Sequence, residues 1–179
     1  MMTKKGYTYF IGAYISLISS PALSYDTLFD IKGGIKMSTC EVLSSEIQNI
    51  VLGDMVLGKD GFGDYVGSTS EKADWDVVLD CPKGVPISTF FNGFTVGTLR
   101  TVAELDKASD MVKGFGVETE ISINGGDWSV VDIARKNNHL SSTEEGIYTM
   151  NFRSYYKQTN NDVSPGSANA TMSLEIIYN

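Results

Sequence analysis

The residues of this chain that could do chemistry are few. Its 179 residues contain two cysteines, Cys40 and Cys81, and one histidine, His139. Two thiols and an imidazole could hold a zinc ion, but His139 stands in the polar run Lys-Asn-Asn-His at 136–139, which predicts a loop. One histidine also leaves little room for acid–base catalysis by imidazole. In an exported protein, the better interpretation of the cysteine pair is one disulfide.

Other motifs that carry chemistry are missing or incomplete. The sequence has no nucleophile elbow, no His-Glu-x-x-His pair and no P-loop. The run Gly61-Phe62-Gly63 has the glycines of a phosphate-binding loop, but no helical pattern follows, so a hairpin tip is the better interpretation. Asp60 and Asp64 lack the spacing of a calcium loop and are interpreted as solvated carboxylates. We therefore expect no enzymatic activity, no cofactor and no metal site.

The first 24 residues predict a secretory signal peptide. Lys4 and Lys5 supply a positive start, residues 7–18 are largely apolar, and Ala22 and Ser24 have the spacing of a cleavage site. A transmembrane anchor is the alternative, but the apolar run is shorter than the ~20 residues that a membrane span needs. We expect cleavage after Ser24, export, and no stable membrane span.

The expected mature chain is acidic. It keeps 12 basic and 22 acidic residues, a formal charge of −10. This charge argues against nucleic acid or an anionic membrane as partner. A disulfide between Cys40 and Cys81 would close a loop of about 40 residues and contribute roughly 4 kcal/mol to stability.

The mature chain shows short alternating runs of apolar and polar residues, the pattern of half-buried strands. A hairpin signal, Asn124-Gly125, separates two of them. Residues 47–52 form a further short apolar run, 58–70 predict a loop, and 102–113 could hold a turn of helix. The pattern predicts one β-sandwich domain. The alternating runs are 75–79, 87–91, 117–123, 128–133, 148–152 and 168–178.

The two ends of the mature chain carry the most regular alternation. At the N-terminal end, Asp30, Lys32 and Lys36 alternate with a row of apolar residues and a glycine: Phe29, Ile31, Gly33, Ile35 and Met37. Most domains fray at their ends, so an apolar strand there needs a groove to lie in. Periodicity alone favours pairing within its own sheet over pairing with another molecule.

Four segments, in order along the mature chain, resemble one known family. They are residues 26–35 leading to Cys40, residues 50–54, residues 79–84 around Cys81, and residues 168–178 with the penultimate Tyr178. Together they are similar to type 1 fimbrial subunits, the pilins built by the chaperone–usher pathway of Gram-negative bacteria. The resemblance spans the whole mature chain and rests on the order and spacing of these segments.

The resemblance implies an all-β fold: an incomplete immunoglobulin-like β-sandwich that lacks its final strand. Residues 25–39 would be an N-terminal donor-strand extension, and 40–179 the pilin domain. The missing strand leaves an open apolar edge, which is prone to aggregation. In the family a periplasmic chaperone first lends a strand, and the extension of the next subunit then replaces it. Chaperone–pilin pairing is an established example of such strand addition.

The resemblance also implies which residues act. The donor strand would be Phe29, Ile31, Gly33, Ile35 and Met37, its glycine letting the two backbones approach closely. The C-terminal strand would line the acceptor groove with Met172, Leu174, Ile176 and Tyr178. The implied partners are other pilin subunits, a periplasmic pilus chaperone and an outer-membrane usher.

The implied function is that of a structural subunit of a fimbria, which polymerises by donor-strand exchange, supports cell adhesion, and is exported through the periplasm to the cell surface. The short extension resembles minor, tip-region subunits more than the major shaft subunit. Three alternatives stay open. A tip adhesin usually carries a further lectin domain, for which 155 mature residues leave no room. The second alternative is a terminator subunit. The third is a self-complete secreted β-sandwich whose N-terminal strand folds back.

Overall fold

The computed structural model describes residues 39–58 and 62–178, which form ten β-strands and no helix. The expected signal peptide and the donor row Phe29–Met37 lie outside the described residues. None of the described residues belongs to a helix that could cross a membrane. The strands are β1 (Glu41–Val42), β2 (Ala73–Cys81), β3 (Ile87–Asn92), β4 (Thr95–Val96), β5 (Leu99–Ala103), β6 (Phe115–Ile123), β7 (Ser129–Val130), β8 (Lys136–Leu140), β9 (Gly146–Gln158) and β10 (Ser173–Ile177).

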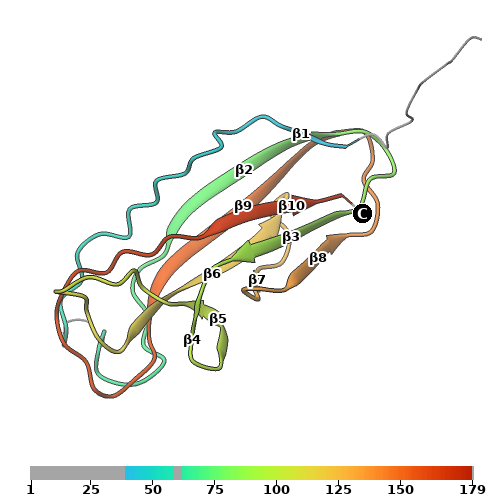
Figure 1. Ribbon diagram of the computed structural model, residues 1–179. Coiled ribbons are helices and arrows are strands. Elements are labelled where there is room, and N and C mark those ends of the chain that lie inside the picture. The colour runs from blue at the N-terminus through green and yellow to red at the C-terminus, as the bar shows by residue number, and fades with distance from the viewer. Residues whose placement is uncertain (1–38, 59–61, 179) are drawn as a thin grey trace, which may run out of the picture. The chain divides into compact units, whose positions relative to one another are not determined.

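The strands form two antiparallel sheets (Figure 1). The larger sheet has the order β1-β2-β9-β6-β5-β4, and β7 pairs with β6. The smaller sheet has the order β10-β3-β8. The prediction of an all-β, two-sheet domain is therefore confirmed.

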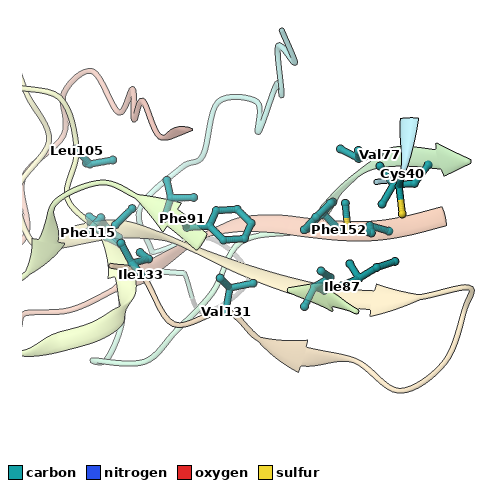
Figure 2. Close-up of a cluster of buried hydrophobic side chains, with 14 of the residues drawn as sticks. Cys40, Val77, Ile87, Phe91, Leu105, Phe115, Val131, Ile133 and Phe152 are labelled. Carbon is teal, nitrogen blue, oxygen red and sulfur yellow. The ribbon is translucent and has the colours of Figure 1, made fainter. Parts of the chain in front are cut away.

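The core lies between the inner faces of the two sheets. In the larger sheet, Trp75 of β2 stands opposite Phe152 of β9, which in turn stands opposite Ile121 of β6. Phe91 of β3 meets the Phe152 ring edge-on, with 5.9 Å between ring centroids. Figure 2 shows Phe91 and Phe152 among the buried side chains gathered between the sheets. Alternate residues of β2, β6 and β9 face this core because strand side chains point to opposite faces in turn.

Most predicted strands are confirmed. The runs predicted at 75–79, 87–91, 117–123 and 148–152 lie within β2, β3, β6 and β9. The predicted hairpin joins β6 to β7, with positive φ at Asn124 (50°) and Gly125 (73°), as a tight hairpin turn requires. Its second strand is shorter than predicted and keeps only Ser129 and Val130.

Three predictions of local structure were wrong. The polar run at 136–139 is not a loop: it forms β8, because polar side chains are tolerated on an edge strand that faces water. His139 lies in this strand, where its Nε2 is 2.7 Å from the Thr89 hydroxyl. Residues 104–113 hold no helix, and 99–103 form β5 instead. The apolar run 47–52 joins no sheet, because pairing with β2 stops after Val42.

Candidate functional site

The C-terminal strand β10 is the least protected edge of the domain. It pairs with β3 along its whole length, from Ser173 opposite Asn92 to Ile177 opposite Ser88. Its other edge has no backbone partner among the described residues. Natural edge strands are usually short, charged or bulged, which discourages further pairing. β10 carries one charged residue, Glu175, so its free edge can accept another strand.

Apolar side chains follow one face of β10 and its flanks. Ser173 and Glu175 are exposed, whereas the residues between and beside them are half-buried and pack against the core cluster. Burial raises the pKa of the Tyr178 hydroxyl above its ordinary value. The structure therefore places all four predicted acceptor residues in one row along the free edge: Met172, Leu174, Ile176 and Tyr178.

A second stretch, residues 45–57, pairs with no strand on either side among the described residues. After β1 the chain continues as an extended segment (Figure 1), and residues 45–57 make no backbone–backbone hydrogen bond within the described part of the chain. Leu52, Met55 and Leu57 are half-buried and pack against the same core cluster as the β10 row. Val51, in contrast, is 81% exposed. Sequence reasoning matched residues 50–54 to the pilin family but gave them no role at the site.

The stretch that leads into β10 and the 45–57 segment both lie near Tyr156 of β9. Its hydroxyl donates a hydrogen bond of 2.8 Å to the carbonyl of Ala168, in the stretch that leads into β10. Burial raises the pKa of Tyr156, and the nearby Asp54 carboxylate of the 45–57 segment raises it further. One tyrosine therefore lies close to both segments.

The approach to β10 is held in place by Asp106. The backbone N–H of Asp106 donates to the Asn169 carbonyl at 2.7 Å. Its carboxylate accepts two hydrogen bonds from Thr171, one from the backbone N–H at 3.2 Å and one from the hydroxyl at 2.9 Å. The start of the free edge is thus fixed by side chain and backbone together.

Two aromatic side chains stack at the margin of the core. Trp75 stacks on Phe152 with 4.1 Å between ring centroids, and its indole N–H donates to the Ser154 hydroxyl at 2.9 Å. Sequence reasoning assigned Trp75 to the core. The structure shows it half-buried at the margin of that core.

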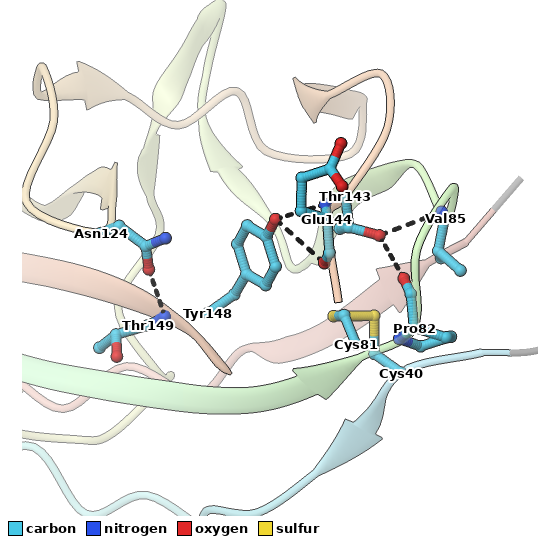
Figure 3. The surroundings of a disulfide bond; sticks show 9 residues. All are labelled: Cys40, Cys81, Pro82, Val85, Asn124, Thr143, Glu144, Tyr148 and Thr149. Carbon is cyan, nitrogen blue, oxygen red and sulfur yellow. Dashed lines mark hydrogen bonds between the residues drawn. A yellow bond between two sulfur atoms is a disulfide. The ribbon is translucent and has the colours of Figure 1, made fainter. Parts of the chain in front are cut away.

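The disulfide between Cys40 and Cys81 is present, as the sequence predicted (Figure 3). Beside it the buried Thr143 hydroxyl donates to the Pro82 carbonyl at 2.6 Å and accepts from the Val85 N–H at 3.0 Å. These bonds hold the turn after β2 in place. Cys40, the first residue after the predicted N-terminal extension, is therefore fixed to the domain.

A polar network on β5, β6 and β9 was not foreseen. The Glu118 carboxylate accepts hydrogen bonds from Lys157 (2.8 Å), Thr101 (2.8 Å) and Tyr155 (2.9 Å). Burial alone would raise the pKa of Glu118, but these hydrogen bonds outweigh burial and hold it below its usual value. All of its partners are hydrogen-bonding side chains of neighbouring strands, so the network ties strands together. No sequence motif predicts this network, because the hydrogen-bonding partners come from separate strands.

Comparison with known proteins identifies the relatives of this chain. The family described as Fimbrial protein matches residues 29–179. A type-1 fimbrial protein subunit of Serratia marcescens is 27% identical over 172 residues, covering 92% of this chain and 93% of that relative. The uncharacterised fimbrial-like protein YdeS of Escherichia coli is 26% identical over 170 residues, covering 93% and 95%. A chain in a solved chaperone–usher pilus has a TM-score of 0.61 at 16% identity, covering 90% of this chain and 99% of that chain. This shared fold confirms the predicted immunoglobulin-like class.

Proposed function

The chain belongs to the Fimbrial protein family and is a structural subunit of a fimbria, and we propose that it polymerises by donor-strand exchange. In this mechanism the N-terminal extension of one subunit adds a strand to the free edge of the next. No step requires catalysis, so the subunit needs neither a catalytic group nor a cofactor.

The observation that carries the proposal is the free edge of β10. Over Ser173–Ile177 its outer edge has backbone groups without a partner in the part of the chain that the structure describes, and a row of half-buried apolar side chains lies beside them. Strand addition would satisfy both needs at once: the backbone groups gain hydrogen bonds, and the apolar row loses its contact with water. The extended 45–57 segment, which packs on the same core, supplies the other margin of the acceptor groove.

The predicted donor strand fits this edge in length and pattern. As a strand, the nine residues Phe29–Met37 would span about 31 Å at ~3.4 Å per residue, enough to cover the about 24 Å of the seven residues Met172–Tyr178. Donor and acceptor rows both repeat with a period of two. Full burial of an apolar side chain contributes roughly 1.5–3 kcal/mol, so four donor side chains can hold two subunits tightly.

The same edge implies the partners met before assembly. An uncovered apolar edge promotes aggregation, so a subunit in transit needs a protein that occupies the edge until the next subunit arrives. A periplasmic pilus chaperone meets this need by lending a strand, and an outer-membrane usher then hands the subunit to the growing fibre. The product is a fimbrium on the bacterial surface that supports adhesion.

The test is a synthetic peptide that copies residues Asp26–Met37. We expect the peptide to bind the subunit and to raise its thermal unfolding temperature, because a ligand of the folded state stabilises it by mass action. Two altered peptides form a matched pair. Ile31→Ser places a hydroxyl in the apolar row and should abolish the stabilisation, whereas Lys32→Ser changes the opposite face and should leave it intact.

The result also separates the alternatives. A mature subunit that is monomeric and equally stable with and without peptide would be a self-complete sandwich, and the proposal would be wrong. Equal stabilisation by the Ile31→Ser and Lys32→Ser peptides would show that the apolar row is not what the groove recognises.

A further inference from the structure

We propose that consecutive subunits also touch outside the groove, with Val42 and Leu43 of the incoming domain docking on the exposed Phe94 turn of the acceptor. This contact rests on the donor-strand function proposed above. It adds a domain–domain surface to what would otherwise be two domains joined by one inserted strand.

The length of the link between donor strand and domain requires close approach. Met37 ends the apolar donor row, and Cys40 is fixed to the domain by its disulfide. Two residues, Ser38 and Thr39, lie between them. Three residue steps at ~3.6 Å reach at most about 11 Å. The incoming domain must therefore lie beside the point where its own donor strand leaves the acceptor groove.

The direction in which the donor strand runs along β10 decides at which end of the acceptor the incoming domain lies. Ile177 of β10 pairs with Ser88, so the end of β10 lies near the same end of the domain as β1 and the disulfide that precedes it (Figure 1). A donor running parallel to β10 would bring the incoming domain to this same end. An antiparallel donor brings it to the Met172 end and leaves the disulfide end free for the next link. Antiparallel pairing is also slightly more stable per residue.

At the Met172 end the acceptor exposes an aromatic ring. Phe94 is 84% exposed in the turn between β3 and β4. The preceding Gly93 lies against Met172: a Cβ atom on Gly93 would be 3.0 Å from the Met172 Cγ. The turn is held by a 2.8 Å hydrogen bond from the Glu104 N–H to the Phe94 carbonyl. A fixed and exposed apolar side chain therefore stands directly at the exit of the groove.

The incoming domain carries apolar residues at the matching place. Val42 and Leu43 stand two and three residues after Cys40 and are 43% and 52% exposed. The Leu43 N–H donates to the Val78 carbonyl at 2.8 Å, so its backbone is anchored to β2. A link of two residues thus brings two exposed apolar surfaces, each on a fixed backbone, to the same point. Contact between them would remove both from water.

The test compares the peptide donor with a whole-subunit donor. The acceptor carries Phe94→Trp, together with Ile31→Ser so that it cannot donate. The donor subunit carries Leu174→Asp so that it cannot accept. The peptide fills the groove but brings no domain. When the whole subunit is the donor, we expect the fluorescence emission of the new tryptophan to shift to the blue and its quenching by acrylamide to decrease. When the peptide is the donor, we expect neither change. The same pair without Phe94→Trp supplies the background from Trp75 and Trp128.

Two variants sharpen the test. Leu43→Asp in the donor subunit should abolish the shift and make the pair dissociate about tenfold faster, a change that corresponds to about 1.4 kcal/mol. Val130→Trp on β7, an apolar position that is 43% exposed elsewhere, should show no donor-dependent shift.

The outcomes are distinct. An equal shift with peptide and subunit, or no shift with either although both bind, would overturn the Phe94 contact and leave donor-strand exchange standing. Failure of the unaltered peptide to bind would overturn donor-strand exchange itself, and the contact with it.

Discussion

Loss of the disulfide should remove most of the stability of the isolated domain. Cys40 and Cys81 are 41 positions apart, and the loop-closure entropy of a link of this length is about 4 kcal/mol. Domains of ordinary size have a total of about 5–15 kcal/mol. A domain with an unfilled groove starts at the low end of this range, because part of its apolar core is uncovered. The double substitution Cys40→Ala/Cys81→Ala should therefore leave it largely unfolded without a donor.

Urea denaturation with and without the Asp26–Met37 peptide measures this effect. At about 2 kcal/mol per M of urea, the loss corresponds to a fall of about 2 M in the midpoint. Peptide at a hundred times its dissociation constant should restore about 2.7 kcal/mol. The wild-type protein after reduction is the control, since it loses the link but keeps both side chains. A midpoint shift below about 0.5 M in both samples would refute the reasoning.

Three further predictions concern the strands. Gly116→Ala would place a Cβ atom 2.5 Å from Val102 Cγ1, so calorimetry should show a loss of about 1–3 kcal/mol from overpacking. Hydrogen bonds lower the pKa of Glu118 in the folded state, so its carboxylate stabilises the domain at any pH above its unfolded pKa of 4.5. This stabilisation is lost as the pH falls. Glu118→Gln should therefore flatten the dependence of the urea midpoint on pH below pH 5. Leu174→Asp should abolish peptide binding in calorimetric titration, whereas Glu175→Asn on the outward face should preserve it.

The strands with a strong period of two could be predicted from the sequence, because one side of each faces the core and the other faces water. β2, β6 and β9 are of this kind. β8 was missed because both of its faces are polar, and nothing in a polar run distinguishes an edge strand from a loop. β4 and β5 were missed because they are short and their pairing is irregular, with a register shift between Thr95 and Val96.

The residues of the candidate site also differ in whether a local sequence pattern predicts them. The half-buried apolar row on β10 could be predicted because its alternation is local. The packing of Leu52, Met55 and Leu57 against the core could not be predicted, because these apolar residues follow no regular period and are recognised only by what they contact. The Asp106–Thr171 clamp joins residues 65 positions apart, and no local pattern encodes such a contact. Phe94 belongs to this group, since its exposure depends on how β3 turns into β4.

The contrast between the edges of the two sheets bears on function more directly than any single residue does. Among the described strands, the larger sheet ends in β1 and β4, each two residues long. The smaller sheet ends on one side in β8, which is polar and has a register shift opposite Ile87 and Ser88. Shortness, polarity and irregular register are ordinary ways to prevent edge-to-edge pairing. β10 has none of these features, although the same chain provides them at β1, β4 and β8. An edge that has no partner among the described residues, where the other edges are protected, supports the proposal that β10 receives a strand from another subunit, and the matched Ile31→Ser and Lys32→Ser peptides test this proposal directly.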